Sequence, residues 1–312
     1  MLIAGVDVGG TNVEVGVVAD DHEVVERAKC PTPTEGPDAL VETIVDMITS
    51  FDADVIGVGI GIPGPVHEGQ VVSVPNLEDW SEPVDVAGLV SDRLNVPVAL
   101  GNDANLGLLG EWVNGVAQGR SNVLGVWIGT GIGAGLILDG RPYVGSVGGA
   151  GEFGHMIIRA DGALCSCGRR GCVEAYAGRR RMVDTIKQMI NAGRTTSLFD
   201  IQGDEGKDRP TSKVWKRALE EEDPLVTEVF DGAVEAVALG VASTINLLDL
   251  EQVVIGGGMA EKLGQDLADR IRERAEPFMM QPDPELSFDV AALGDDSGVV
   301  GAASIGRAKA HR

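Results

Sequence analysis

The sequence predicts an α/β protein of two domains, and three observations support this fold class. At 312 residues the chain is long enough for two domains of ordinary size. Runs of β-branched residues alternate with stretches of helical spacing. The chain opens as strand, Gly/Thr turn and strand at 2–18, and the same pattern returns at 122–138. This repeat indicates two related halves facing each other across a cleft, which we place at 1–118 with 296–312 and at 119–295.

The first glycine turn is a candidate phosphate and metal site. Strands are expected at 2–8, 13–18 and 24–28. A strand and not a helix is expected after the glycines, which argues against a dinucleotide-binding fold and against a Walker P-loop. The backbone N–H groups of Gly9, Gly10 and Thr11 could still bind phosphate oxygens, with Asp7 holding Mg²⁺ directly or through water. A plain hairpin turn explains these residues equally well.

Two loops after the next strands supply further candidates. Helices are expected at 36–50 and 84–94, and strands at 55–62 and 96–100. Gly64 follows the first of these strands in a Pro-Gly-Pro loop, a common place for ligand contacts. Asp103 follows the second strand, where a helix begins near Ala104. It is either the N-cap of that helix, the commoner role for an aspartate there, or a catalytic base.

The second half repeats the turn and adds a third glycine run. Gly129-Thr130-Gly131 lies between strands and, with Ala134, nominally satisfies G-x-G-x-x-A, but the following strand excludes a Rossmann fold. Gly256-Gly257-Gly258 precedes a helix and is either a plain turn or a ligand loop. The other expected elements are strands at 122–128, 134–138, 252–255 and 288–293, helices at 106–116, 173–191, 212–221, 224–247 and 297–310, and a polar, mobile surface segment at 192–210.

A cluster of cysteines and one histidine predicts a structural metal site. The candidate ligands are His155, Cys165, Cys167 and Cys172. Three thiolates and one imidazole form a usual closed shell for zinc, with no open position for chemistry. Glycines 168 and 171 lie between the last two cysteines, where a chain that folds round an ion needs tight turns. The alternatives are ordinary buried cysteines, or a disulfide with a spare thiol.

The stretch around this cluster resembles a known signature. Glu152-x-Gly154-His155, followed by Cys165-x-Cys167-Gly168-x-x-Gly171-Cys172-x-Glu174, is similar to the pattern of the ROK family of repressors, open-reading-frame proteins and sugar kinases. The resemblance implies a two-domain actin-like ATPase (ribonuclease H-like) fold with an interdomain cleft. It implies ATP-dependent phosphorylation of a hexose, with glucose favoured and N-acetylhexosamines or fructose as alternatives.

The same resemblance implies roles for individual residues. The cluster would bind Zn²⁺, and Asp103 would be the base for the attacking sugar hydroxyl. Mg²⁺ and the phosphates of ATP would lie at the two glycine turns, and adenosine at the third glycine run. The implied sugar contacts are Gly64, Asn76, Asn102, Asp103, Glu152, His155 and Glu174. The implied nucleotide contacts are Asp7, Gly9, Gly10, Thr11, Asn12, Gly129, Thr130, Gly131, Gly256, Gly257 and Gly258.

Composition limits the possible partners. The chain has 48 acidic and 25 basic residues, for a formal net charge of −23. Such a surface repels nucleic acid and anionic membranes. The scarcity of lysine, seven residues in all, favours a halophilic host. With no signal peptide and no membrane span in the sequence, a cytoplasmic protein is expected, and the resemblance adds a homodimer or homotetramer.

A sugar-sensing transcriptional repressor of the same family is the alternative from another functional class. Such repressors carry a helix-turn-helix of several dozen residues before the Asp-x-Gly-Gly-Thr strand. Here that strand begins at residue 2, and the charge is strongly negative, so a kinase is expected.

Overall fold

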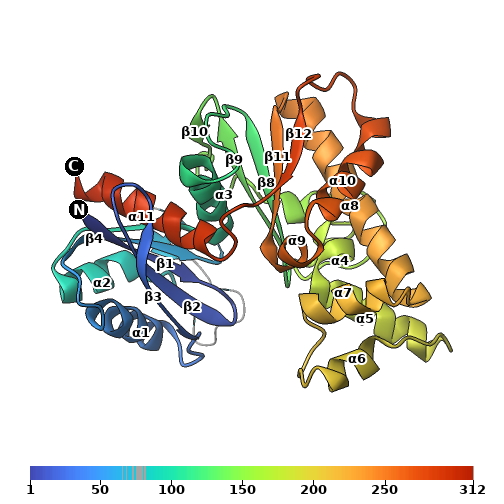
Figure 1. Cartoon of the computed structure of the whole chain (residues 1–312), viewed down its shortest axis with the longest axis horizontal. Coiled ribbons are helices and arrows are strands. Elements are labelled where there is room, and N and C mark those ends of the chain that lie inside the picture. The colour runs from blue at the N-terminus through green and yellow to red at the C-terminus, as the bar shows by residue number, and fades with distance from the viewer. Residues whose placement is uncertain (65, 68, 72–73, 75–79, 81, 312) are drawn as a thin grey trace. The chain divides into compact units, whose positions relative to one another are not determined.

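The computed structural model describes residues 1–64, 66–67, 69–71, 74, 80 and 82–311 (Figure 1). The predicted sugar contact Asn76 lies outside the described residues. The described residues form two five-stranded sheets and one two-stranded sheet, with helices beside them. The predicted α/β class and the repeat of strand, turn and strand are confirmed.

The first sheet carries the carboxyl ends of three parallel strands at one edge. β1 pairs with β4, and β4 with β7, in parallel, whereas β2 and β3 pair antiparallel. The register places Asp7 opposite Gly61, and Gly61 opposite Gly101. Residues that follow these strands therefore meet at the same edge. The order is β3-β2-β1-β4-β7, with β1 at Leu2–Val8, β2 at Asn12–Val18, β3 at Val24–Pro31, β4 at Val55–Ile62 and β7 at Val98–Asn102.

Alternate residues of β1 face different helices, as the two-residue period of a strand requires. Ala4, Val6 and Val8 pack into the core that α1 and α2 cover. Ile3 has the opposite parity and packs against α11. Asp7 shares that parity, so its carboxylate faces the start of α11. The helices of this sheet are α1 (Pro37–Thr49), α2 (Val86–Leu94), α3 (Asp103–Asn114) and α11 (Asp296–Ala310).

Glycines allow α11 to lie directly on the sheet and on α3. A Cβ at Gly5 would overlap the carbonyl oxygen of Val299, and a Cβ at Gly59 would overlap that of Ala302. Between the two helices, a Cβ at Gly301 would overlap the carbonyl oxygen of Leu106. The close approach of backbone to backbone therefore requires glycine at Gly5, Gly59 and Gly301.

The second sheet repeats the hairpin of the first. Its order is β10-β9-β8-β11-β12, with β8 at Val123–Ile128, β9 at Ile132–Leu138, β10 at Arg141–Pro142, β11 at Gln252–Gly256 and β12 at Ser287–Val290. The short strands β5 (Val66–His67) and β6 (Gln70–Val71) form the third sheet. The remaining helices are η1 (Phe153–His155), α4 (Glu174–Ala177), α5 (Arg179–Asn191), α6 (Leu198–Asp204), α7 (Ser212–Glu220), α8 (Pro224–Leu248), α9 (Gly257–Leu263), α10 (Gln265–Ala275) and η2 (Glu276–Phe278).

Two predicted elements are wrong in detail. The helix expected at 173–191 is broken at Gly178, which ends α4 and begins α5. The segment at 192–210, expected to be a mobile surface segment, contains α6. Buried Leu198 anchors this helix, and the Asp223 carboxylate fixes its start by accepting bonds from the N–H and Oγ of Ser197 at 2.6 and 2.9 Å.

The chain divides into two compact units. The first comprises Met1–Gly125, Gly135–Gly151 and Ala292–Arg312, and the second Val126–Ala134 and Glu152–Ala291. The predicted division at residues 118 and 296 differs from these bounds, since 135–151 falls in the first unit. Because compactness alone does not define a domain, the domain boundaries stay a prediction.

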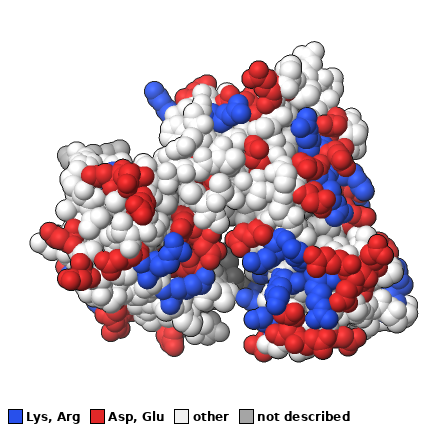
Figure 2. All heavy atoms as spheres, in the orientation of Figure 1, with Lys and Arg blue, Asp and Glu red and all other residues white. Residues whose placement is uncertain are grey.

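Acidic side chains cover much of the surface in view, while Lys and Arg gather over α5 and α7 (Figure 2). Among the residues that the structure describes, no helix combines the length and the apolar character needed to cross a bilayer.

Candidate active site and metal centre

Asn102 and Asp103 are positioned together at the sheet edge where β7 passes into α3. Asn102 is the N-cap of α3, since its Oδ1 accepts a bond from the Asn105 N–H at 3.1 Å. Its Nδ2 donates to the Gly64 carbonyl oxygen at 3.3 Å and to Asp103 Oδ1 at 3.0 Å. The N-cap role considered for Asp103 is therefore wrong. The amide of Ala104 also donates to Asp103 Oδ1, at 2.8 Å, so the carboxylate is held by the residues on either side of it.

Asp7 and Asp103 form an acidic pair on neighbouring elements of this edge. The pKa of Asp7 is raised to about 7, first by burial and next by the negative charge of Asp103. Glu14 and Asp295 act in the same direction, whereas Lys29 opposes them. A Cβ at residue 298 would collide with the Asp7 carboxylate, so this position requires glycine. Two carboxyl groups that disfavour each other's charge are suited to a cation between or beside them.

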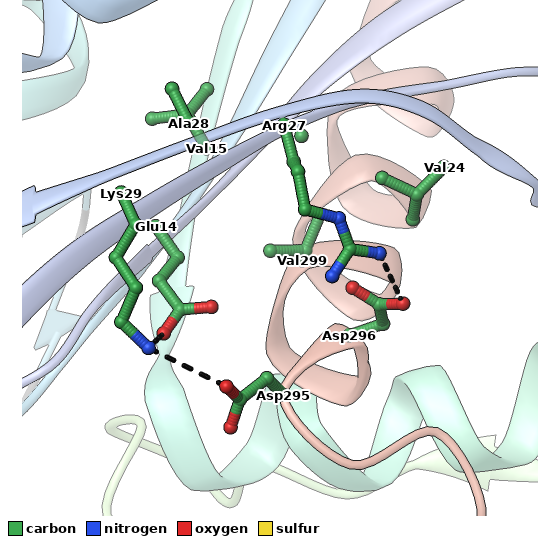
Figure 3. Close-up of a pocket in the computed structure, with 10 residues that line it drawn as sticks. Glu14, Val15, Val24, Arg27, Ala28, Lys29, Asp295, Asp296 and Val299 are labelled. Atoms are coloured by element: carbon green, nitrogen blue, oxygen red, sulfur yellow. Dashed lines mark hydrogen bonds and ion pairs between the residues drawn. The ribbon is translucent and has the colours of Figure 1, made fainter.

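A small charged pocket lies between β2, β3 and the start of α11, and one of its lining residues, Glu14, is the strand partner of Asp7 (Figure 3). It has a volume of about 150 Å³. Lys29 pairs with Glu14 and, at 3.4 Å, with Asp295, while Arg27 pairs with Asp296 at 2.8 Å. Both basic side chains of the pocket are thus already paired with carboxylates. We therefore interpret these ion pairs as contacts that hold β3 against the start of α11.

Each Gly/Thr turn is closed by a backbone hydrogen bond from its first glycine, although the two bonds span different numbers of residues. In the first, the Gly9 N–H donates to the Asn12 carbonyl oxygen at 2.8 Å. In the second, the Gly129 N–H donates to the Gly131 carbonyl oxygen at 3.0 Å. The first amide of each turn is thus used by the turn itself. The Gly9 amide, which was predicted to bind phosphate, therefore already has a partner. Gly10 is exposed, and Thr11 and Thr130 follow the closing amides.

The predicted metal ligands come together in one cluster. The donor atoms of His155, Cys165, Cys167 and Cys172 all lie within 4.8 Å of one another. The Sγ of Cys165 lies 3.7 Å from His155 Nδ1, and the Sγ atoms of Cys167 and Cys172 are also 3.7 Å apart. A disulfide needs about 2.05 Å, and all four cysteines of the chain are free. The disulfide alternative is therefore wrong.

The spacing of these donors fits a tetrahedral ion. Zinc–sulfur bonds of about 2.3 Å place the sulfurs of a tetrahedral shell about 3.8 Å apart, close to the 3.7 Å between Cys167 and Cys172. Burial and the neighbouring thiols raise the pKa of Cys172 to about 12. Burial opposes ionisation of Cys167 too, but hydrogen bonds from the Arg169 amide and the other thiols lower its pKa. A bound cation would offset the cost of gathering several thiolates.

Glu174 joins the metal loop to the second glycine turn. Its Oε1 accepts a bond from Ser166 Oγ at 2.8 Å, between two of the cysteines, and its Oε2 accepts one from the Ile132 N–H at 3.0 Å. His155 turns Nδ1 toward the cysteines and places Nε2 3.9 Å from Glu152 Oε2. One ring nitrogen can therefore ligate a metal while the other stays available for a hydrogen bond. The structure thus brings Glu152, His155 and Glu174 to the metal loop.

Packing and backbone conformation explain the glycines of the third run, Gly256 to Gly258. A Cβ at Gly256 would meet the ring of Trp127, and Gly257 has a φ of +82°, a conformation that favours glycine. A Cβ at Gly258 would lie 3.0 Å from Ser212 Oγ. These contacts bring the run close to the start of α7 and explain why a simple turn between β11 and α9 contains three glycines.

Sequence reasoning missed Arg179 and Glu111. Arg179 stands in a run of three arginines, which reads as a solvated surface, yet it contacts Thr130 and Ser212. Glu111 stands on the apolar helix α3 and is fully buried. The one signal for Glu111 is an acid within an apolar helical stretch.

Comparison with known proteins identifies the family. The model of the ROK family matches residues 3–309. The chain belongs to the ROK family. Curated relatives include a glucokinase of Streptomyces coelicolor, 33% identical over 98% of each chain, and an N-acetylgalactosamine kinase of a Shewanella species, 32% identical over 97% of this chain and 96% of the relative. A crystal structure of a ROK glucokinase from Streptomyces griseus with glucose and AMPPNP matches with a TM-score of 0.86 and 32% identity, over 99% of this chain and 100% of that one. The predicted actin-like ATPase fold of this ROK protein is confirmed.

Proposed function

We propose that this ROK protein is an ATP-dependent hexose kinase that converts glucose to glucose 6-phosphate. The observation that carries the proposal is the full-length similarity to a ROK glucokinase solved with glucose and AMPPNP. Glucokinases of similar identity and coverage support it. The acidic pair, the glycine turns and the Cys/His cluster provide the parts that phosphoryl transfer to a sugar requires.

In this proposal, Asp103 is the general base. It would take the proton of the attacking sugar hydroxyl, and such a base typically contributes ~10²–10⁴-fold to the rate. Its Oδ1 is fixed by Asn102 and by the Ala104 amide, so little reorganisation is needed at the moment of reaction. Asn102 would contact a second hydroxyl of the sugar, and Gly64 would lie beside it because Asn102 bonds to its carbonyl oxygen.

Asp7 and the two turns would bind the donor. Phosphoryl transfer depends on positioning and on neutralised phosphate charge rather than on covalent help from the protein. Mg²⁺, when bound, supplies part of that neutralisation. A cation at Asp7 would also relieve the repulsion between the carboxylates of Asp7 and Asp103. The amides of Gly10, Thr11, Thr130 and Gly131 would contact phosphate oxygens, with Gly256, Gly257 and Gly258 next to adenosine.

The metal loop would orient the sugar. The four-ligand cluster fits zinc in a closed structural shell. Binding energy at such a site is folding energy, so a metal here would fix the positions of Glu152, His155 and Glu174. These three side chains would then bind the remaining hydroxyls, and a site matched to hydroxyls rejects analogues that lack them.

A sugar panel tests this assignment. We expect ADP release with ATP and glucose, and a loss of most turnover in Asp103→Asn with little change in glucose affinity. An N-acetylhexosamine kinase is the second candidate, because an N-acetylgalactosamine kinase is among the relatives. Faster turnover of N-acetylhexosamines or fructose would replace glucose as the substrate. Wild-type turnover in Asp103→Asn would remove Asp103 from the mechanism. A homodimer or homotetramer stays a prediction.

A further inference from the structure

Arg179 lies between two of the loops that the proposed function assigns to the nucleotide. It is the first residue of α5, and its backbone N–H donates to the Gly129 carbonyl oxygen at 3.1 Å. Its guanidinium donates to Thr130 Oγ1 at 3.2 Å and to Ser212 Oγ at 2.8 Å. The same guanidinium would lie 4.0 Å from a Cβ at Gly258. One side chain thus reaches from the second Gly/Thr turn to the third glycine run.

The charge of Arg179 is not balanced by its partners. The side chain is half-buried, and both hydroxyls that it contacts are neutral. Several other arginines of the second unit face acids, as Arg194 faces Glu228 at 2.8 Å and Arg270 faces Asp231 at 2.5 Å. The described side-chain contacts of Arg179 include no carboxylate, although the chain has 48 acids and 25 bases. A partly desolvated cation without an anion is costly and is best relieved by an anionic ligand.

Two further features of the same place point to a ligand. Burial, followed by the nearby positive charge of Arg209, lowers the pKa of Arg179, so the protein itself disfavours this charge. The buried Oγ1 of Thr211, next to Ser212, has no hydrogen-bond partner among the described residues. Lys and Arg side chains also gather over α5 and α7 (Figure 2).

We infer that Arg179 binds the phosphate group nearest the ribose of the nucleotide, with Ser212 and Thr130 orienting its guanidinium. The inference rests on the proposed function for the place of the nucleotide. A guanidinium presents several N–H donors in a fixed fork, which matches phosphate oxygens. Thr130 would therefore act in two ways, by its backbone in the turn and by its hydroxyl on Arg179.

Isothermal titration of the full-length protein with ADP and with adenosine tests the inference. Hydrogen bonds to a charged group are worth enough that Arg179→Gln should weaken ADP binding about 10- to 100-fold. Adenosine affinity and the KM for glucose should change by less than about 2-fold, since neither involves this phosphate. The matched control is Arg181→Gln on the same helix, whose guanidinium faces Asp184 at 3.3 Å and whose ADP affinity should match the wild type.

Each other outcome overturns the inference. Unchanged ADP affinity in Arg179→Gln excludes a phosphate contact, and an equal loss for ADP and adenosine shows a merely structural role. If Arg179→Gln does not fold, Arg179→Lys replaces it, because it keeps the charge. This variant should weaken ADP binding by a smaller factor and leave adenosine binding unchanged. Unchanged ADP binding in Arg179→Lys would also overturn the inference. Because binding is measured without a sugar, a protein that phosphorylates no hexose would defeat the proposed function while leaving this test intact.

Discussion

Asp7→Asn should make the protein more stable while removing its activity. The pKa of Asp7 is raised from 3.8 to about 7, first by burial and then by Asp103. The folded state therefore holds this proton more tightly than the unfolded state, and stability falls as the pH rises from about 4 to about 7. The difference between these two pKa values corresponds to at most about 4 kcal/mol, and partial exposure of the carboxylate reduces the expected effect to about 1–3 kcal/mol.

Urea unfolding at pH 5 and pH 8, with EDTA present, measures this effect. At pH 8 wild-type Asp7 is mostly charged, so Asp7→Asn should unfold at higher urea. At pH 5 Asp7 is protonated in the folded state but ionised in the unfolded state, so about 40% of that difference should remain. The control is Glu42→Gln, which removes an exposed charge from α1 of the same unit and should show no such pH dependence. Equal stability of Asp7→Asn and wild type at both pH values, or a less stable variant at pH 8, would refute the reasoning. Turnover with Mg²⁺ and ATP should be lost in either case, because Asp7 is the proposed metal ligand.

Three other predictions concern the metal loop, the buried acid of α3 and the surface charge. Cys167→Ser should lose bound zinc by elemental analysis and should lower the unfolding temperature and glucose affinity together, whereas Cys30→Ser, outside the cluster, should keep both; intact glucose affinity in a folded, metal-free protein would contradict the role of the loop. Glu111→Gln should lose about 2–4 kcal/mol of unfolding free energy. The carboxylate accepts hydrogen bonds from the amides of Val116, Ala292 and Leu293 and from Ser297 Oγ. Glutamine would place an N–H₂ group, itself a donor, against some of these donors. Activity and unfolding temperature should rise from dilute buffer to molar KCl if the net charge of −23 reflects a halophilic host; best activity in dilute buffer would remove that idea.

The local parts of the fold could be predicted from the sequence because they depend on near neighbours. The β1–β2 hairpin follows from β-branched runs around a glycine turn, and the metal cluster follows from three cysteines within eight positions. Contacts between distant segments left no such pattern. Glu111 accepts from residues about 180 positions away, and Arg179 meets Ser212 across 33 positions. No periodicity or spacing rule reports a partner of that kind.

The role of a glycine is hard to predict from the sequence, because the sequence does not show which group lies close to its backbone. The glycines of the third run are explained by the Trp127 ring, by a positive φ and by Ser212 before any nucleotide is considered. The backbone N–H groups of Gly9 and Gly129 donate the hydrogen bonds that close their turns. A phosphate-binding interpretation of glycine-rich turns therefore needs the amides that remain and the charges beside them.

Those charges distinguish two hairpins that share one backbone design. The first turn follows an acid, Asp7, whose neighbours Asp103 and Glu14 are also acids. The second turn follows Trp127 and Ile128 and is backed by the guanidinium of Arg179 on Thr130. A cation is favoured beside the first and an anion beside the second. The repeat visible in the sequence is thus a repeat of strand, turn and strand. The opposite charges beside the two turns come from Asp7 and Glu14 within its first copy and from Asp103 and Arg179 outside both copies.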